Sequence, residues 1–593
     1  MAVLASKDDS KHVMGTGSSP DPLPLPTNPE TTLEKEPALT TEDKENAEEL
    51  GHTEISREET QEPEYPPMVK VLPIVAAVYM AFFLIALDRT IIATAVPRIT
   101  DDFHSLGDVG WYGSAYMITG CAFQLFMGRV YTFYSPKKVF LSSIALFEIG
   151  SILCGAAPNS TAFIVGRAIA GSGSSGVFSG AIIIIMGLVP LHKRPLLQSL
   201  VGAIFGVASV IGPLLGGVFT TKVSWRWCFY INLPIGGVAM VILLFILENP
   251  KASKGSTPWR QQVKQLDPIG TVFFIAGMVC VLLALQWGGT TYSWSSARII
   301  ALLVLFVLFI TIFIIVQIWQ QETATIPPRI VKNRSIIAGM WTQFSVGSTM
   351  MTFLFYLPLW FQAIKDVSAE KSGIDIIPLI IALVIASILA GGLVQRIGYY
   401  VPFMLANSVI MSIGAGLLTT FTPSTNHEKW IGYQVVFGFG LGLGMQQAVL
   451  AAQAVLAKND VPTGVALIMF CQQLGGAIFV SIDQNILSNE LAKGLAGVGN
   501  IQPSKVVSVG ATELRKVVDT ADLKAVLSTY NGAVVKVFEA GLALACLSVL
   551  GSAAMEWKNI KKAKSKSDEA GIEEGDIASR DIVNDKKTEQ SNG

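Results

Sequence analysis

Long apolar segments separated by short polar connections make up most of the chain between residues 71 and 555. A helix needs about 20 apolar residues to cross the ~30 Å hydrocarbon layer of a membrane, and it satisfies its backbone polar groups internally. Fourteen segments meet this requirement. They lie near residues 71–97, 110–131, 138–157, 161–188, 198–220, 229–248, 268–287, 298–319, 336–363, 374–394, 401–421, 431–456, 464–487 and 532–555. The pattern predicts an all-α polytopic membrane protein with 14 transmembrane helices.

Composition agrees with this class and argues against several others. The 593 residues are 51% hydrophobic and only 15% charged, and the mean hydropathy is +0.51, well above that of a soluble domain. Six scattered cysteines give neither a disulfide framework nor a metal-ligand spacing. A nucleotide-binding loop of the GxxxxGK[ST] type is absent from the sequence. We therefore expect no cofactor, no metal, no nucleic-acid partner and no enzymatic activity.

Both ends of the chain differ from its middle. Residues 1–67 and 558–593 are rich in polar and charged residues and nearly devoid of aromatic ones, so they cannot bury enough apolar surface to fold. We predict two disordered tails. The first tail lacks the charged and apolar regions of a secretory signal, so the first apolar segment is expected to direct membrane insertion.

Basic residues gather in alternate connections, which orients the chain. Because cytoplasmic loops carry an excess of Lys and Arg, the side with these residues is predicted to be the cytoplasm, together with both tails. These residues are Lys137, Lys138, Lys193, Arg194, Lys251, Lys254, Arg260, Lys264, Arg329, Lys332, Arg334, Arg396 and Lys458. The opposite side carries segment 489–531, in which residues 511–530 have the pattern of a short amphipathic helix.

Charged residues within the spans are the main candidates for chemistry. In "LIALDRTIIATAVPRI" (84–99), Asp88 lies about 13 Å inside the outer end of the first span, and Arg167 lies about 9 Å below the outer face on the fourth. Asp88 and Arg167 can therefore pair, either as a structural ion pair or as a charge lining a transport pathway. Arg89 points about 100° away from Asp88, and we expect its long stem to extend outward to the membrane surface.

Other carboxyl groups also lie in apolar segments. Glu148, about ten residues into the third span, is a second buried carboxyl with either a packing or a proton-coupling role. Asp483, Lys536 and Glu539 lie near predicted outer helix ends, where we expect solvation at the interface. A carboxyl whose cationic partner is gained or lost can change its protonation, which is what a proton-coupled carrier needs.

The fifth span is unusually rich in small residues. Its glycines at four-residue spacing allow helix backbones to approach closely, and its proline removes a backbone hydrogen bond and bends the helix. The residues are Gly202, Gly206, Gly212, Pro213, Gly216 and Gly217. Taken alone, the pattern is explained by packing.

Several of these segments match the motifs of one family. "GPLLGG" (212–217) resembles motif C, the antiporter motif of the major facilitator superfamily, and "IVGRAIAGSGSSG" (164–176) resembles its motif B. "LDRTIIATAVPRI", "WRWCFYINLPIGG" and "FYLPLWFQAIKDVSAEKSGI" resemble signatures of the fourteen-span drug:H+ antiporter family. The similarity runs from about residue 71 to 557, and fungal toxin and multidrug efflux pumps of the aflatoxin and HC-toxin type are the most similar in appearance.

One motif departs from the family pattern. "GRVYTFYSPKK" (128–138) resembles the cytoplasmic motif A, but Thr132 occupies the place of the usual Asp and Ser135 that of a Gly. The related "GGLVQRIGYY" (391–400) has Gln395 at the acidic position. The internal repeat indicates two related halves, while the substitutions argue against a charged cytoplasmic latch.

The resemblance implies a major facilitator fold with a cavity between its halves. Two six-helix bundles, 71–248 and 336–555, would flank an additional two-helix insert at 268–319, with 489–531 as an outer loop. The substrate would bind near the midplane between the bundles. Candidate cavity residues are Gln124, Gln343, Phe344, Tyr356, Gln446, Gln447, Gln472 and Gln473. Each of them has interhelical hydrogen bonding as an alternative role.

The functional hypothesis that follows is a proton-coupled exporter of a hydrophobic or amphipathic small molecule. Inward proton movement would protonate Asp88 or a neighbouring carboxyl. An importer of siderophores or basic amino acids, possible also in a vacuolar membrane, is the alternative, and a non-transporting receptor or scaffold is a third. The resemblance favours a monomer in the lipid bilayer, and we expect the plasma membrane because neither tail carries a sorting signal directing the chain elsewhere.

Overall fold

A computed structural model of the chain describes residues 65–105, 108–248, 265–289, 291–496 and 522–561. Within these ranges the regular elements are helices, together with one isolated bridge between Gly288 and Tyr292. The predicted tails, apart from 65–67 and 558–561, lie outside the described residues, as do Lys251, Lys254, Arg260 and Lys264. The first half of the predicted helix at 511–530 also lies outside them.

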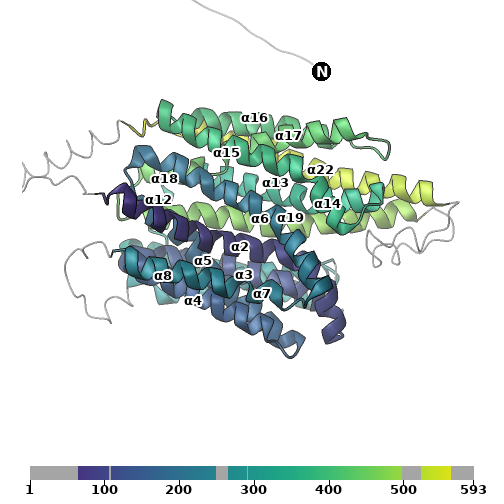
Figure 1. Cartoon of the computed structure of the whole chain (residues 1–593), viewed down its shortest axis with the longest axis horizontal. Helices are drawn as coiled ribbons and strands as arrows, with labels where there is room; N and C mark the ends of the chain where they lie inside the picture. The colour runs from purple at the N-terminus through teal and green to yellow at the C-terminus, as the bar shows by residue number, and fades with distance from the viewer. Residues whose placement is uncertain (1–64, 106–107, 249–264, 290, 497–521, 562–593) are drawn as a thin grey trace, which may run out of the picture. The chain divides into compact units, whose positions relative to one another are not determined.

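The first group of helices comprises α2 (Met68–Phe103), α3 (Val109–Phe133), α4 (Pro136–Gly155), α5 (Ser160–Leu188), η2 (Leu191–Lys193), α6 (Arg194–Lys222), α7 (Trp227–Tyr230) and α8 (Asn232–Ile246). In this group α5 packs against both α3 and α4, while α2 packs against α6 and α8. The two short helices η2 and α7 connect longer ones. Figure 1 shows most of this group in purple to teal in the lower half of the helical body, whereas α6 lies beside α15 of the second group described next.

The second group comprises α13 (Arg334–Lys365), α14 (Ala369–Asp375), α15 (Ile377–Ile397), α16 (Val401–Leu418), α17 (His427–Gly444), α18 (Gln447–Val455), α19 (Val461–Leu495) and α22 (Leu523–Ala554). Helix α13 packs against α19 and α22, and α17 packs against α15 and α16. Between the groups in sequence lie α10 (Pro268–Trp287), α11 (Ala297–Gln320), η3 (Gln321–Thr323) and α12 (Pro328–Val331). Helices α10 and α11 pack against each other, and α10 also contacts α3 and α19.

The number of spans differs from the sequence prediction by one. Of the described helical segments, 13 are long and apolar enough to cross a membrane, whereas the sequence predicts fourteen. The difference is α3, whose 25 residues would extend about 37 Å but which is not among these 13. Its Gln124 is fully buried and donates to Ser179 on α5, so this polar side chain faces another helix and not lipid.

Helix ends also depart from the predicted segments. Helix α19 continues to Leu495 and α22 already begins at Leu523, so both extend into the predicted outer loop 489–531. The second half of the predicted amphipathic helix is the first part of α22, not a separate element. The bundle and insert limits otherwise remain predictions.

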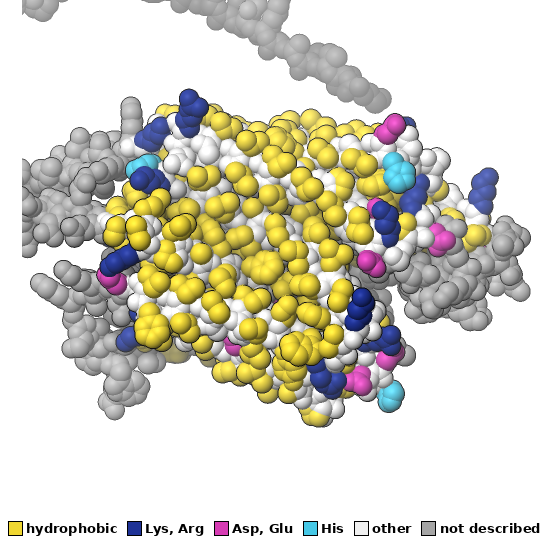
Figure 2. All heavy atoms as spheres, viewed as in Figure 1, with side chains coloured by type: hydrophobic (Ala, Val, Ile, Leu, Met, Phe, Trp, Pro, Cys, Tyr) yellow, Lys and Arg dark blue, Asp and Glu magenta, His cyan; other side chains and the backbone are white. Residues whose placement is uncertain are grey.

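The surface of the helical body has the character expected of a membrane protein. Figure 2 shows a broad apolar band across the middle of the visible face, with charged side chains gathered toward the two ends of the helices. On α11, Val304 and Val307 are 61% exposed and Ile318 is 64% exposed. Such a continuous exposed apolar surface is unfavourable in water and favourable against lipid tails.

The two groups meet mainly where α6 packs against α15 and α3 packs against α19, and α6 also contacts α14 and α18. At the end where the predicted cytoplasmic residues lie, the hydroxyl oxygens of Thr132 and Thr463 are 3.4 Å apart. Arg194 Nη1 donates to Gln453 Oε1 at 3.4 Å in the same region. A Cβ added at Gly128 would lie 2.3 Å from Ala466 Cβ, so the groups are in close contact at this end.

Candidate functional site

Asp88 on α2 and Arg167 on α5 form an ion pair inside the first helix group. Arg167 Nη1 lies 2.6 Å from Asp88 Oδ2, and the side chains are 1% and 0% exposed. Arg167 Nε also donates to the Tyr112 backbone oxygen at 2.9 Å, and its guanidinium lies 4.4 Å from the centre of the Tyr116 ring. The contact expected from the depth of the two charges is therefore present.

The pair is only partly satisfied by hydrogen bonds. Asp88 Oδ1 is buried and has no hydrogen-bond partner among the described residues. A buried pair of charges is stable only while both partners remain charged. A proton bound at Asp88 would remove its attraction to Arg167, so this pair can connect proton binding to a movement of α2 relative to α5.

Arg89 contradicts the prediction that its side chain extends outward to the membrane surface. It points instead between the two helix groups, where its Nη2 donates to Gln473 Oε1 on α19 at 3.1 Å. Gln473 Nε2 in turn donates to Gln124 Oε1 at 3.0 Å, and Gln124 Nε2 donates to Ser179 Oγ at 2.6 Å. A polar partner on a neighbouring helix makes a long extension to the surface unnecessary, which the sequence of α2 alone does not reveal.

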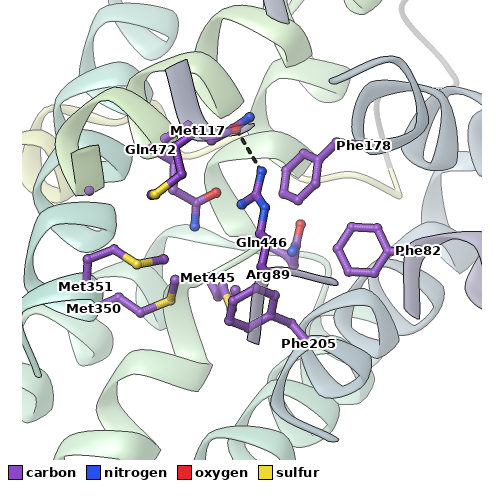
Figure 3. Close-up of a pocket in the computed structure, with 12 residues that line it drawn as sticks. Phe82, Arg89, Met117, Phe178, Phe205, Met350, Met351, Met445, Gln446 and Gln472 are labelled. Atoms are coloured by element: carbon purple, nitrogen blue, oxygen red, sulfur yellow. Dashed lines mark hydrogen bonds between the residues drawn. The ribbon is translucent and has the colours of Figure 1, made fainter. Parts of the chain in front are cut away.

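A cavity lies beside Arg89 between the helix groups. Its described lining consists of Phe82, Arg89, Met117, Phe178, Phe205, Met350, Met351, Met445, Gln446, Gln472, Gln473 and Gly476. Figure 3 shows Arg89 in the middle of these side chains, with Phe82 and Phe178 on one side and Met350 and Met351 on the other. The volume of the cavity is about 40 Å³. The cavity must widen to hold a typical organic ligand.

Only some of the predicted cavity residues line this space. Gln446, Gln472 and Gln473 line the cavity. The other five candidates are absent from the lining, and two of them, Gln124 and Gln343, are fully buried. The remaining three are Phe344, Tyr356 and Gln447. The aromatic and methionine residues of the lining were missed because apolar residues in an apolar helix give the same signal whether they face a cavity, a neighbouring helix or lipid.

A break in one helix borders the cavity. Helix α17 ends at Gly444 and α18 begins at Gln447, so Met445 and Gln446 interrupt the span. Gln343 Nε2 donates to the Met445 backbone oxygen at 2.9 Å, which satisfies a carbonyl freed by the break. Broken helices beside a midplane cavity are a recurring feature of transporter binding sites, and "FGFGLGLGMQQ" (437–447) is the sequence signal for this one.

Glu148 lies away from the cavity, inside the first helix group. It is 8% exposed, and neither carboxyl oxygen has a hydrogen-bond partner among the described residues. Its Oε1 would lie 1.9 Å from a Cβ added at Gly236 of α8, so the carboxyl fills the space that this glycine leaves. This contact explains why position 236 has no side chain. The proton-coupling role of Glu148 stays a prediction.

Asp483 contradicts the prediction of a carboxyl solvated at a helix end. It is fully buried, and its Oδ2 accepts a hydrogen bond of 2.6 Å from Thr352 Oγ1 on α13. The prediction failed because α19 continues for twelve residues after Asp483, to Leu495. Lys536 and Glu539, by contrast, form an ion pair of 2.8 Å and are 55% and 46% exposed, as expected near an interface.

The glycines of the fifth span, α6, face two different neighbours. A Cβ at Gly212 or Gly216 would lie 2.1 Å from the hydroxyl of Thr90 or Thr94 on α2, whereas a Cβ at Gly206 would lie 2.8 Å from Val384 on α15. A Cβ at Gly202 would make ordinary contacts of 3.4 Å, and a Cβ at Gly217 would meet nothing within 4 Å. One helix therefore packs closely within its own group and across to the other.

The outer end of α2 is held by residues from "WRWCFYINLPIGG" (225–237). Arg226 Nη1 and Trp225 Nε1 donate to Asp102 Oδ2 at 3.0 and 3.2 Å. The hydrogen bond from Arg226 is the main reason that the pKa of Asp102 lies below its usual value. This contact fixes the end of the helix that carries Asp88 and Arg89.

Comparisons with known proteins agree on one family. The sequence model of the Major Facilitator Superfamily matches residues 78–319 and 269–480. The "MFS-type transporter VdtG" of Byssochlamys spectabilis is 52% identical over 84% of this chain and 90% of that relative. The "Rubrofusarin-specific efflux pump aurT" of Gibberella zeae is 49% identical over 84% and 92% of the two chains. The "Efflux pump aflT" of Aspergillus parasiticus is 48% identical over 83% and 97%.

Solved structures share the fold at low sequence identity. The human organic anion transporter MFSD10 superposes with a TM-score of 0.52 and 12% identity, over 81% of this chain and all of that one. The proton:xylose symporter XylE gives a TM-score of 0.51 and 14% identity, over 83% and 98%.

Proposed function

The chain belongs to the major facilitator superfamily of membrane transporters, and from this membership we propose that it is a proton-coupled exporter of a hydrophobic or amphipathic small molecule. Its relatives, named as transporters and efflux pumps, identify it as a transporter and not an enzyme. Export, as opposed to import, is supported by the names of relatives that match nearly their whole length.

The cavity between the helix groups is the observation that carries the proposal. It is lined mainly by phenylalanine and methionine side chains, with amides and one guanidinium among them, which suits a ligand with a large apolar surface. The helix groups pack closely at the predicted cytoplasmic end. Release of the substrate to the opposite side therefore requires the groups to separate at that opposite side. Alternating access by a rocking movement of the two groups provides that opening.

Proton coupling is assigned to Asp88. When its proton is absent, the ion pair with Arg167 holds α2 and α5 together. Proton binding from outside weakens this pair, and the two states then differ in their most stable helix arrangement. Binding of substrate from the cytoplasm and of protons from outside at different stages of one cycle gives antiport. We place the protein in the plasma membrane as a monomer with both termini in the cytoplasm.

The test measures accumulation of fluorescent lipophilic compounds in cells that lack their own efflux pumps. Wild type, Asp88→Asn, Arg167→Ala and the control Asp101→Asn, at an exposed position of α2, are compared at equal surface expression, with and without a protonophore. We expect wild type and the control, which lies on the same helix outside the pair, to lower accumulation. The two pair variants and the protonophore are expected to abolish the effect.

Two results would count against the proposal. If wild type leaves accumulation unchanged for every compound, export of this compound class is wrong. If Asp88→Asn exports as well as wild type, the Asp88 and Arg167 pair is structural and proton coupling must involve another carboxyl, with Glu148 the next to substitute.

A further inference from the structure

Arg89 is the one charged side chain among the described residues that line the cavity between the helix groups. The remaining lining side chains are phenylalanines, methionines and glutamines, none of which carries a charge. A ligand in this space therefore meets a single positive charge and no negative one. Charge selection by the cavity wall depends on this residue.

The charge of Arg89 is not neutralised within the site. The neighbouring Asp88 is engaged with Arg167 at 2.6 Å, and the hydrogen-bond acceptor of Arg89 is the neutral amide oxygen of Gln473. Its Nε is buried and has no hydrogen-bond partner among the described residues. A cation at this depth with an unused donor is costly unless an anion or another acceptor approaches it.

Aromatic rings give the guanidinium partial compensation. The guanidinium carbon lies 5.5 Å from the centre of the Tyr116 ring and 5.8 Å from that of Phe178, which is cation–π distance. Phe178, Phe82 and Phe205 all face the cavity, and the rings of Phe82 and Phe178 are 5.2 Å apart. These faces and the methionine sulfurs favour contact with a flat aromatic ligand.

From this arrangement we infer that the cavity selects aromatic compounds bearing an oxyanion, such as a carboxylate or an ionised phenol, over neutral and cationic compounds of the same shape. The oxyanion pairs with Arg89, whose free Nε and planar guanidinium can offer two parallel donors. The ring system lies among the phenylalanine and methionine side chains. A cation is disfavoured because it would approach Arg89 with no carboxylate in the lining to offset the repulsion. The inference rests on the proposed function, since it names the class of substrate for the same cavity.

The experiment uses three fluorescent compounds that share one ring system. They are 9-anthracenecarboxylate, its methyl ester and 9-(aminomethyl)anthracene, which at pH 7.5 are an anion, a neutral molecule and a cation. Binding to the purified full chain in detergent is measured by titration of anthracene fluorescence. We expect the carboxylate to bind wild type about tenfold or more tightly than the ester, since a hydrogen bond to a charged group is worth that much, and the amine to bind most weakly.

Variants of Arg89 test whether the preference comes from this residue. Arg89→Gln is expected to lose the tenfold preference while ester affinity stays within about twofold, and Arg89→Lys to retain part of it. The control is Arg298→Gln, which removes one positive charge from an exposed position at the start of α11 and should keep the wild-type order. The ranking in wild type alone tests the inference if Arg89→Gln does not fold.

Transport in proteoliposomes separates this inference from the proposed function. One outcome is that a pH gradient drives transport of both the ester and the carboxylate and that the two compounds bind with equal affinity. In that case proton-coupled export is supported and the anion preference is wrong. If the carboxylate binds preferentially but no gradient moves any of the compounds beyond protein-free liposomes, the preference remains and proton-coupled export is wrong. Preferred binding of the amine, or an unchanged preference in Arg89→Gln, also overturns the inference.

Discussion

Adjacent residues on one helix serve different parts of this transporter. Asp88 faces the interior of its own helix group and pairs with Arg167, whereas Arg89 faces the cavity and contacts Gln473 of the other group. The helical turn of about 100° per residue separates the two charges. Asp483 has no ion-pair partner among the described residues; its contact is a hydroxyl group. Asp88 and Asp483, both fully buried, therefore depend on different partners.

The same substitution at these two aspartates should have unequal effects on stability. Asp88→Asn leaves the Arg167 charge buried and unpaired, which typically costs about 3–5 kcal/mol. Asp483→Asn keeps an oxygen to accept the Thr352 hydroxyl and breaks no ion pair, so we expect a change within about 1 kcal/mol. Thermal unfolding of both purified variants against wild type measures the difference. Equal destabilisation would mean that Asp483 is held as a charged carboxylate by a partner outside the described residues.

At the scale of elements, α6 packs against two other helices, α2 of its own group and α15 of the other group. Its Gly212 and Gly216 pack on α2, and its Gly206 packs on α15 of the other helix group. Thr90 Oγ1 also donates to the Ala208 backbone oxygen on α6 at 3.0 Å. The glycines of the segment that resembles motif C therefore position the helix that carries Asp88 and Arg89.

We expect Gly212→Ala to separate α6 from α2. The new Cβ would lie 2.1 Å from Thr90 Oγ1 and 3.0 Å from a backbone nitrogen, so helices must shift at a cost of about 1–3 kcal/mol. Gly217→Ala, where a Cβ meets nothing within 4 Å, is the matched control and should leave stability nearly unchanged. Thermal unfolding in detergent reports both. If the two variants unfold at the same temperature, the close approach of α6 and α2 is wrong.

At the scale of the whole molecule, the two helix groups are in close contact at the predicted cytoplasmic end. Thr132, at the place where the family has an aspartate, lies against Thr463 of the other helix group, and small residues pack around Gly128. Among the described residues, Thr132 contributes a hydroxyl contact here in place of a carboxylate. Alternating access requires these contacts to separate in each transport cycle, because the cavity can otherwise open on one side only.

A reversible cross-link across this contact should stop transport. With the six native cysteines replaced, Thr132→Cys and Thr463→Cys are combined, since the hydroxyls they replace are 3.4 Å apart and neighbouring side chains of this kind can reach disulfide geometry. We expect oxidant to abolish substrate efflux and dithiothreitol to restore it, while each single cysteine variant is unaffected by oxidant. Full efflux from a protein that is cross-linked on a gel would contradict alternating access through this contact.

The pattern of apolar segments by itself determined the membrane class and the approximate helix positions, while the family came from the resemblance of individual motifs. It did so because crossing the bilayer requires long apolar helices whatever their neighbours are. The depth of Asp88 and Arg167 in their spans was also sufficient to predict their contact, since both charges needed a partner in the hydrocarbon layer.

Only the tertiary structure decided which side chains face one another. Arg89 could be assigned to the cavity only once Gln473 on α19 was in place, and the burial of Asp483 depended on how far α19 extends and on Thr352 of α13. The phenylalanine and methionine lining could not be predicted either. At one depth in the membrane, an apolar side chain can face lipid, protein or cavity, and the sequence looks the same in each case. The rotation of each helix about its axis is fixed by packing against distant parts of the chain, and that rotation places Arg89 in the lining of the cavity.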